Sequence, residues 1–317
     1  MGVTERTIFE QFSYWRMAIG PVAPPPDAAM TVFVGCGTSY NLALSLAALS
    51  NAARRPAIAV PGGEWLNRPS SYWPDWANTH VVALSRSGET TETVAAARAS
   101  RAAGAFVTAI TCEAESDIAR NCDRLLYAET HPAEGIVMTS SASLMLLLGL
   151  QLLGYTIEPS VIETATGLLD GIDAQLPALL AGRSHFVFLG SGPLYGVALE
   201  AALKLQEMSQ IFTQAFHPLE YRHGPISLVD EHTVAVMLYG DVQPQAEATL
   251  ARELSQKGAL VVGFGGPGDF SLPVRANPAL VGLASLPALQ LLGERAAQAR
   301  NIDTVAPRHL TKVVTLT

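Results

Sequence analysis

Val32-Phe33-Val34-Gly35-Cys36-Gly37-Thr38-Ser39-Tyr40 and Val187-Phe188-Leu189-Gly190-Ser191-Gly192-Pro193-Leu194-Tyr195 are two copies of one pattern at a constant offset along the chain. Each copy is an apolar run of strand length, a Gly-x-Gly turn and the start of a helical stretch. The match continues into the two helical stretches. A strand-turn-helix unit that opens both halves predicts two related domains.

The same alternation of apolar runs and longer amphipathic stretches continues along the chain. Apolar runs occur at Thr31–Val34, His80–Leu84, Phe106–Thr111 and His185–Leu189, and helical stretches at Leu42–Asn51, Glu92–Arg101 and Ala198–Met208. This rhythm is typical of a parallel sheet with helices on both faces, so we expect an α/β fold. The helical stretch Pro159–Leu180 is predicted to connect the halves.

The composition indicates a globular protein of a reducing compartment. The chain has 317 residues, 49% of them apolar, which suffices for two cores. No apolar run approaches the roughly 20 residues of a membrane span, and the charged start lacks the apolar stretch of a signal peptide. The cysteines (Cys36, Cys112 and Cys122) form neither an even set nor a C-x-x-C pair. We therefore expect a cytoplasmic protein without disulfides or a membrane partner.

Two further classes are disfavoured by charge and motif. The formal charge of −8 argues against a nucleic-acid partner. A dinucleotide-binding turn would need a third glycine, where the two copies have Tyr40 and Tyr195. No His, Asp or Glu cluster has metal-ligand spacing, so we expect neither a metal nor another cofactor.

A hydroxyl-rich turn, Ser85-Arg86-Ser87-Gly88-Glu89-Thr90, follows an apolar run and precedes a helical stretch. Hydroxyls and backbone N–H groups at a helix N-terminus can hold a phosphate, because they donate hydrogen bonds and the helix dipole favours negative charge. The alternative is that these hydroxyls are only N-caps. Thr38 and Ser39 follow the neighbouring strand, but the second half has Pro193 and Leu194 there. This difference favours a ligand site confined to the first half.

The second half has fewer distinctive residues. Glu200, Lys204 and Glu207 fall on one face of a predicted helix, and taken alone they predict a solvated face. His223 precedes a Gly-Pro break and so belongs to a loop, where catalytic groups concentrate, although most lone loop histidines are structural. Lys312 in the C-terminal tail could simply lie along an apolar contact.

Five motifs together resemble the sugar isomerase (SIS) domain family over nearly the whole chain. The likeness is to the isomerase half of glucosamine-6-phosphate synthase and its stand-alone, deaminase-like relatives. The motifs are Gly35-Cys36-Gly37-Thr38-Ser39-Tyr40, Ser85-x-Ser87-Gly88-Glu89-Thr90, Ala198-Leu199-Glu200-x-Ala202-Leu203-Lys204-Leu205-x-Glu207, Glu220-x-x-His223-Gly224-Pro225 and Pro307-Arg308-x-Leu310-x-Lys312.

The resemblance implies two tandem SIS domains, each a parallel sheet flanked by helices in a flavodoxin-like three-layer sandwich. Residues 1–157 would form the phosphosugar-binding domain, and residues 158–317 the domain with the catalytic Glu, His and tail. The implied substrate-binding residues are Thr38, Ser39, Ser85, Arg86, Ser87, Thr90, Val137 through its backbone, and Thr139.

The resemblance also implies catalytic roles for three residues. Glu207 would move a proton between C1 and C2, His223 of the partner subunit would assist ring opening, and Lys312 would close over the open-chain sugar. A residue lent in this way requires a homodimer. A 1,2 proton shift does need one carboxylate and a separate acid-base group, and a lysine can condense with a carbonyl or stabilise negative charge.

The chain departs from the synthase pattern at several points. Arg86 stands where the family has Gln, and Val137-Met138-Thr139-Ser140 where it has Ala-Ser-Thr-Lys. We expect no glutaminase domain before the sugar domains, which would favour release of ammonia over its incorporation. We expect an isomerase/deaminase that converts glucosamine 6-phosphate into fructose 6-phosphate and ammonia. A fructosamine-phosphate deglycase and a non-catalytic sugar-phosphate sensor remain alternatives.

Overall fold

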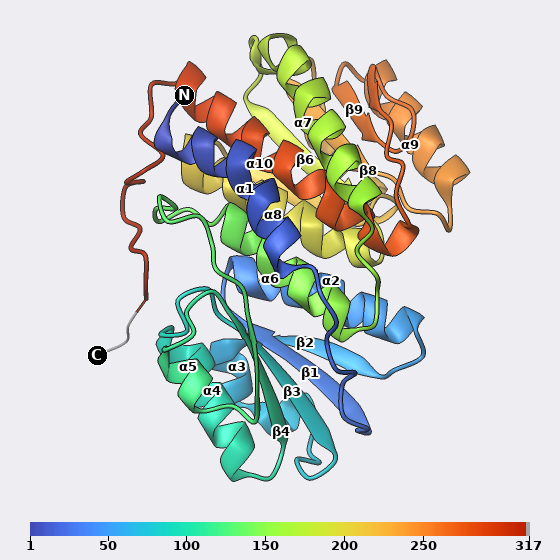
Figure 1. The fold of residues 1–317 in the computed structure, drawn as a ribbon. Coiled ribbons are helices and arrows are strands. Elements are labelled where there is room, and N and C mark those ends of the chain that lie inside the picture. The colour runs from blue at the N-terminus through green and yellow to red at the C-terminus, as the bar shows by residue number, and fades with distance from the viewer. Residues whose placement is uncertain (315–317) are drawn as a thin grey trace. The chain divides into compact units, whose positions relative to one another are not determined.

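A computed structural model describes residues 1–314 of the chain (Figure 1). Its internal contacts divide the chain into two compact domains. Within the described residues, the first domain comprises Phe9–Ile157 together with tail residues 309–314, and the second comprises Glu158–Arg308 together with Met1–Ile8. The tail, which the sequence placed with the second half, thus groups with the first domain.

The first domain is built on a five-stranded sheet in which all neighbouring strands run parallel, in the order β2-β1-β3-β4-β5. Helices α2 and α6 pack together, and α3, α4 and α5 form a second group (Figure 1). The alternate residues Val32 and Val34 of β1 share a buried cluster with Trp65 of α3 and Ile118 of α5. Helices therefore cover the sheet, as period-two burial requires. The elements are α1 Val3–Ala18, β1 Met30–Gly35, α2 Thr38–Ala52, β2 Ala57–Pro61, α3 Gly62–Asn67, η1 Pro69–Ser71, β3 Thr79–Leu84, α4 Thr91–Ala102, β4 Phe106–Thr111, α5 Asp117–Arg120, β5 Arg124–Tyr127 and α6 Ser140–Leu152.

The second domain repeats this plan with the strand order β7-β6-β8-β9-β10, again all parallel. Helices α7 and α8 both pack against α10, while α9 contributes Leu250 and Leu254 to a cluster with Val187 and Leu189 of β6. The elements are α7 Pro159–Leu180, β6 His185–Gly190, α8 Pro193–Ser209, β7 Thr213–Phe216, η2 Glu220–Arg222, η3 Pro225–Leu228, β8 Thr233–Leu238, α9 Pro244–Gln256, β9 Leu260–Phe264, β10 Phe270–Leu272, η4 Pro278–Leu280 and α10 Val281–Ala299.

The repeated Gly-x-Gly turns have the same geometry in both domains. Gly37 has φ 55° and ψ −125°, and Gly192 has φ 53° and ψ −125°, a conformation that side chains oppose. A Cβ on Gly35 would lie 2.6 Å from the Ser39 carbonyl carbon, and one on Gly190 would lie 2.4 Å from the Leu194 oxygen. Each turn thus needs both of its glycines. The prediction of two related α/β domains is confirmed.

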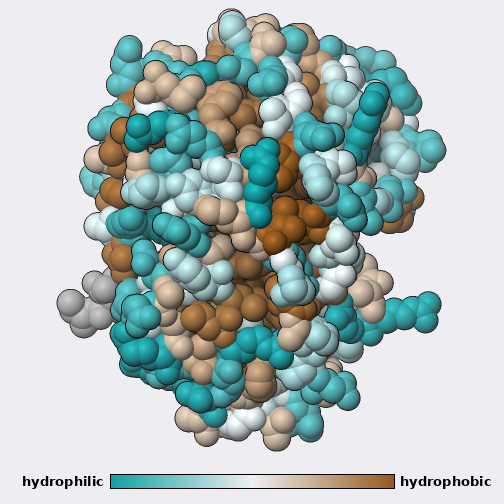
Figure 2. Space-filling view, viewed as in Figure 1, coloured by the Kyte–Doolittle hydropathy of each residue, from teal (hydrophilic) through white to brown (hydrophobic). Residues whose placement is uncertain are grey.

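Helix α7 coincides with the stretch predicted to be helical between the repeats. Its apolar face, which includes Leu168 and Ile172, is buried, and the helix packs on α10. It is therefore part of the second domain's core and more than a connector. Within residues 1–314, no helix has the length and apolarity that crossing a membrane requires. Hydrophilic side chains cover much of the face in Figure 2.

Candidate active site

The hydroxyls of the first domain gather where β1 and β3 end. These strands are neighbours, with Val34 paired to Ala83, so their carboxyl ends lie at the same edge of the sheet. Thr38 and Ser39 form the first turn of α2, and Ser85 directly follows β3. All three are at most 5% exposed. In a sheet of this order, ligands bind at the point where the chain leaves two adjacent strands in opposite directions.

The turn from Ser85 to Thr90 is fixed by its own hydrogen bonds. Ser85 Oγ accepts from the Gly88 N–H at 3.1 Å and donates to Thr90 Oγ1 at 3.4 Å, and Ser87 Oγ accepts from the Glu89 N–H at 3.2 Å. Gly88 has φ 65°, and a Cβ there would meet Ser116 Oγ at 2.0 Å. The turn is therefore preformed.

The N-cap explanation of these hydroxyls does not hold. Thr90 stands at the N-cap of α4, but its side chain makes no capping hydrogen bond to that helix. The N-cap of α2 is Gly37, which has no side chain to offer. Neither helix thus has a side-chain hydrogen bond from its N-cap residue, which favours the ligand-binding interpretation.

Arg86 binds the C-terminal tail. Its Nη2 donates to the Lys312 carbonyl at 2.8 Å, and its Nη1 donates to the carbonyls of Gly135 and Ile136 at 3.0 and 3.1 Å. Lys312 Nζ in turn donates to the Glu134 carbonyl at 3.3 Å. The structure thus brings together Arg86, Lys312 and the loop before Val137, three places that the sequence assigned to one site. The Arg86 contacts go to backbone carbonyls.

Glu134 organises the loop that carries Val137 and Thr139. Its Oε1 accepts from the Thr139 N–H at 2.6 Å, the Thr139 hydroxyl at 2.9 Å and the Ser141 N–H at 3.0 Å. This carboxylate lies at the N-terminus of α6, where the helix dipole favours it. Glu134 was not among the site residues predicted from the sequence. An acidic residue shortly before a Ser/Thr run that opens an apolar helix was the available signal.

The acid-base cluster of α8 is buried, so the expectation of a solvated face was wrong. Glu200 is 0% and Lys204 is 1% exposed, because α10 packs over this helix and Gly293 approaches the Lys204 backbone. Lys204 Nζ donates to Glu207 Oε2 and lies 3.6 Å from Glu200 Oε1. The Glu207 side chain retains 21% of its exposure. A buried ammonium between two carboxylates therefore orients the one that still reaches solvent.

His223 is exposed on an anchored loop between η2 and η3. Tyr221 before it is fully buried in the core, and burial raises the pKa of its hydroxyl to about 12. Arg222 binds Glu253 of α9 through two hydrogen bonds of 2.9 and 3.0 Å. Gly224 after it has φ 123°, which favours glycine. The imidazole is thus presented from a fixed backbone.

The predicted site residues form two groups. The hydroxyl turns, Arg86, Val137, Thr139 and Lys312 lie in the first domain, whereas Glu207 and His223 lie in the second. Among residues 1–314, no three His, Cys, Asp or Glu side chains are placed to hold a metal ion.

Comparison with known proteins gives consistent likenesses. The SIS domain profile matches residues 27–154 and 179–272. A glutamine–fructose-6-phosphate aminotransferase from Pyrobaculum aerophilum is 30% identical over 91% of this chain and 52% of its own length. That of Symbiobacterium thermophilum is 34% identical over 75% of this chain and 44% of its own length. The chain thus spans about half the length of these curated relatives.

The chain is also similar to a solved structure over that structure's entire length. The glucosamine-6-phosphate deaminase of Thermotoga maritima is 32% identical, with a TM-score of 0.86, and the match covers 99% of this chain and 100% of that one.

Proposed function

Because this chain belongs to the SIS domain family, we propose that it is a phosphosugar isomerase of the deaminase type. It converts glucosamine 6-phosphate and water into fructose 6-phosphate and ammonia. The observation that carries the proposal is the preformed hydroxyl turn from Ser85 to Thr90 beside Thr38 and Ser39. The choice of reaction is supported by the full-length likeness to the Thermotoga deaminase.

The phosphate is bound by neutral donors. The chain carries a net charge of −8, so long-range attraction does not favour a dianion. Local hydroxyls and backbone N–H groups at the starts of α2 and α4 supply hydrogen bonds and aligned dipoles instead. This design fits Arg86, whose guanidinium is engaged with three carbonyls and acts by holding the tail.

The chemistry is a proton transfer followed by hydrolysis. His223 assists opening of the sugar ring to the free aldehyde. Glu207 removes the proton from C2 and returns it to C1, which converts the amino aldose into a 2-imino ketose. Water adds to the imine carbon, and the C–N bond breaks to leave the ketone and ammonia. Lys204 holds one Glu207 oxygen, leaving the other for the substrate.

The tail contributes Lys312. Its carbonyl is tied to Arg86, and its ammonium reaches the Glu134 carbonyl beside the loop of Val137 and Thr139. In the proposed reaction this ammonium stabilises negative charge that develops on the open-chain sugar oxygen. Arg86 is then a positioning residue that acts through the tail.

The proposal includes a homodimer in which His223 of the partner subunit serves each site. Mixing the inactive variants Glu207→Gln and His223→Asn tests this arrangement. Hybrid dimers should recover up to about a quarter of the activity, as chance pairing of complementary subunits allows. No recovery after subunit exchange, verified by mass spectrometry of tagged chains, contradicts the shared site.

The reaction itself is tested with purified protein and glucosamine 6-phosphate in deuterated water. Equimolar ammonia and fructose 6-phosphate should form, with deuterium at C1 of the ketose from solvent exchange during transfer. A fructosamine 6-phosphate of glycine, offered in parallel, identifies a deglycase if it is the faster substrate. Binding of both compounds without turnover or exchange identifies a sensor, and either outcome overturns the deaminase.

A further inference from the structure

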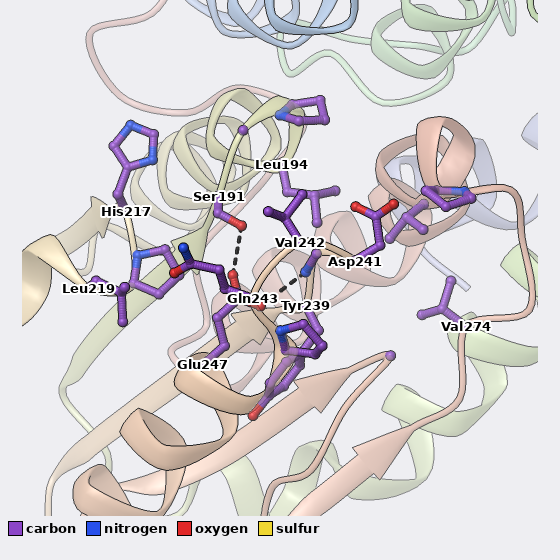
Figure 3. Close-up of a pocket in the computed structure, with 18 of the residues that line it drawn as sticks. Ser191, Leu194, His217, Leu219, Tyr239, Asp241, Val242, Gln243, Glu247 and Val274 are labelled. Carbon is purple, nitrogen blue, oxygen red and sulfur yellow. Dashed lines mark hydrogen bonds between the residues drawn. The ribbon is translucent and has the colours of Figure 1, made fainter. Parts of the chain in front are cut away.

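The second domain carries a cavity at the switch point that corresponds to the hydroxyl site of the first. It lies where β6 and β8 end, and these neighbouring strands match β1 and β3 in the sheet order. Its volume is about 660 Å³, within the range of small-molecule sites. Ser191 and Leu194, from the second copy of the repeat, line one side (Figure 3).

A carboxylate of the chain itself takes the hydrogen bonds that a phosphate would need here. Glu247 Oε1 accepts from the Ser191 hydroxyl at 2.6 Å, and Oε2 accepts from the Gly240 N–H at 3.1 Å. In Figure 3 the Ser191 hydroxyl and the Glu247 carboxylate point toward one another. Glu247 is 2% exposed and comes from the start of α9. The Ser191 hydroxyl and the Gly240 N–H, one donor at the end of each strand, are thus already satisfied by an internal anion.

The charges around this carboxylate exclude a second anion. Asp241 also lines the cavity, and none of the described lining residues is Lys or Arg. His217 also lines the cavity, and its ring is stacked on Tyr195 at 4.0 Å between centroids. Burial raises the pKa of Glu247, while its bonds to Ser191 and Gly240 oppose that rise. The positive charge of a bound cation would offset the cost of burying the Glu247 carboxylate. A phosphate would instead be repelled by that carboxylate.

Most of the remaining cavity wall is apolar, with Gln243 among the polar exceptions. Leu194, Leu219, Val274 and Val281 line it, together with the ring of Tyr239, whose hydroxyl is engaged with the Pro267 carbonyl at 2.6 Å. A carboxylate accepts through about four lone-pair sites, of which the chain uses two at Glu247. The lining therefore offers a hydrophobic wall and spare acceptor capacity on an acidic group.

We propose that this cavity is a second ligand site, selective for a small organic cation whose ammonium binds Glu247 and whose apolar body packs against the leucine and valine wall. It does not accept sugar phosphates. The site is independent of the proposed catalysis, because it uses none of the residues assigned to the reaction.

Three probes that share a benzyl group and differ in their polar group test this proposal on the full chain in the absence of sugar. Benzylamine, benzyl alcohol and benzyl phosphate are titrated by ligand-observed NMR against the wild type. Benzylamine should bind about tenfold more tightly than benzyl alcohol, since a charge-assisted hydrogen bond is stronger than a neutral one. Equal affinity of the two, or no benzylamine binding at millimolar concentration, overturns the proposal.

Two variants place the binding in this cavity. Glu247→Gln should remove the preference for benzylamine over the alcohol, while Glu231→Gln, a matched change at an exposed position, should preserve it. Val274→Trp fills the cavity and keeps Glu247, so it should abolish binding of both probes even if Glu247→Gln folds poorly. Benzylamine binding that survives in Val274→Trp contradicts the assignment. These experiments measure probe binding and not ammonia release, so a negative result would leave the proposed deaminase function unaffected.

Discussion

The two domains share a strand order and a Gly-x-Gly turn, yet their switch points have opposite chemistry. In the first domain, the hydrogen bonds that fix the turn from Ser85 to Thr90 join hydroxyls and backbone N–H groups, with no carboxylate among them. In the second, Pro193 and Leu194 replace two hydroxyls, and Glu247 occupies the donors that remain. In our proposal one backbone frame serves two ligand classes, because a few side chains set the charge at each switch point.

The largest expected effect concerns the base in the second domain. Glu207→Gln keeps the size and the contact with Lys204 but cannot accept a proton, so kcat should fall about a thousandfold or more with KM little changed. Coupled ammonia and ketose assays measure it. Glu163→Gln, a matched change on the exposed face of α7, is the control. A variant kcat within tenfold of the wild-type value would contradict the role of Glu207 as the catalytic base.

The next effect concerns the pH dependence of stability, which we expect to differ between the two domains. His80, the second residue of β3, is fully buried with its Nε2 2.8 Å from Thr108 Oγ1, whereas β8 has Val234 at its second position. Burial lowers the pKa of His80 to about 4. Between pH 6.5 and 4 the unfolded chain is protonated there and the folded chain is not, so stability present above pH 6.5 is lost as pH falls, by up to about 3 kcal/mol.

His80→Val should therefore weaken the first domain near pH 7, because it leaves the Thr108 hydroxyl unpaired, yet make its stability less sensitive to acid. Urea unfolding followed by tryptophan fluorescence reports this domain alone. The four tryptophans of the chain, Trp15, Trp65, Trp73 and Trp76, all lie in it. Equal pH slopes for wild type and variant between pH 6.5 and 4 contradict the account.

A smaller effect is expected at the phosphate turn. Ser87→Ala removes one hydroxyl donor while the Ser85 bond that shapes the turn remains. KM for the sugar phosphate should rise about tenfold with kcat largely retained. Ser13→Ala, at an exposed serine of the same domain, is the control. An unchanged KM would mean that the phosphate binds elsewhere.

The smallest effect tests the tail. Arg86→Gln removes the bond to the Lys312 carbonyl, so KM should rise by a few-fold and trypsin should cleave after Lys312 faster. Arg124→Gln is the matched control, because Arg124 also binds backbone carbonyls, those of Ala23 and Pro24. Unchanged proteolysis in Arg86→Gln refutes the role of Arg86 in holding the tail.

Much of the fold could be predicted because its determinants are local. The repeated strand-turn-helix pattern and the glycines required at Gly35 and Gly190 are visible as letters, and α7 was predicted to the residue. The clustering of Thr38 with Ser85 follows from the rule that parallel strands end at one edge. The resemblance to a family then supplied roles that single motifs could not.

The remainder depends on contacts between residues far apart in the sequence. The helical spacing of Glu200 and Lys204 fits a surface as well as a core, and only the packing of α10 decides between them. Arg86 was predicted as a substrate ligand, and nothing in the sequence indicates that its guanidinium also donates to the carbonyls of Gly135, Ile136 and Lys312. In the sequence, Glu247 is an acidic residue on an amphipathic helix like any other. Only the fold shows that it accepts hydrogen bonds from Ser191 and Gly240.

Counting phosphate sites tests the contrast between the domains most directly. Isothermal titration calorimetry of the full chain with fructose 6-phosphate should give one binding site per chain. Its affinity should fall in Ser87→Ala and should not change in an excess of benzylamine. Two sites per chain, or one site that benzylamine displaces, would contradict the assignment of phosphate to the first switch point alone.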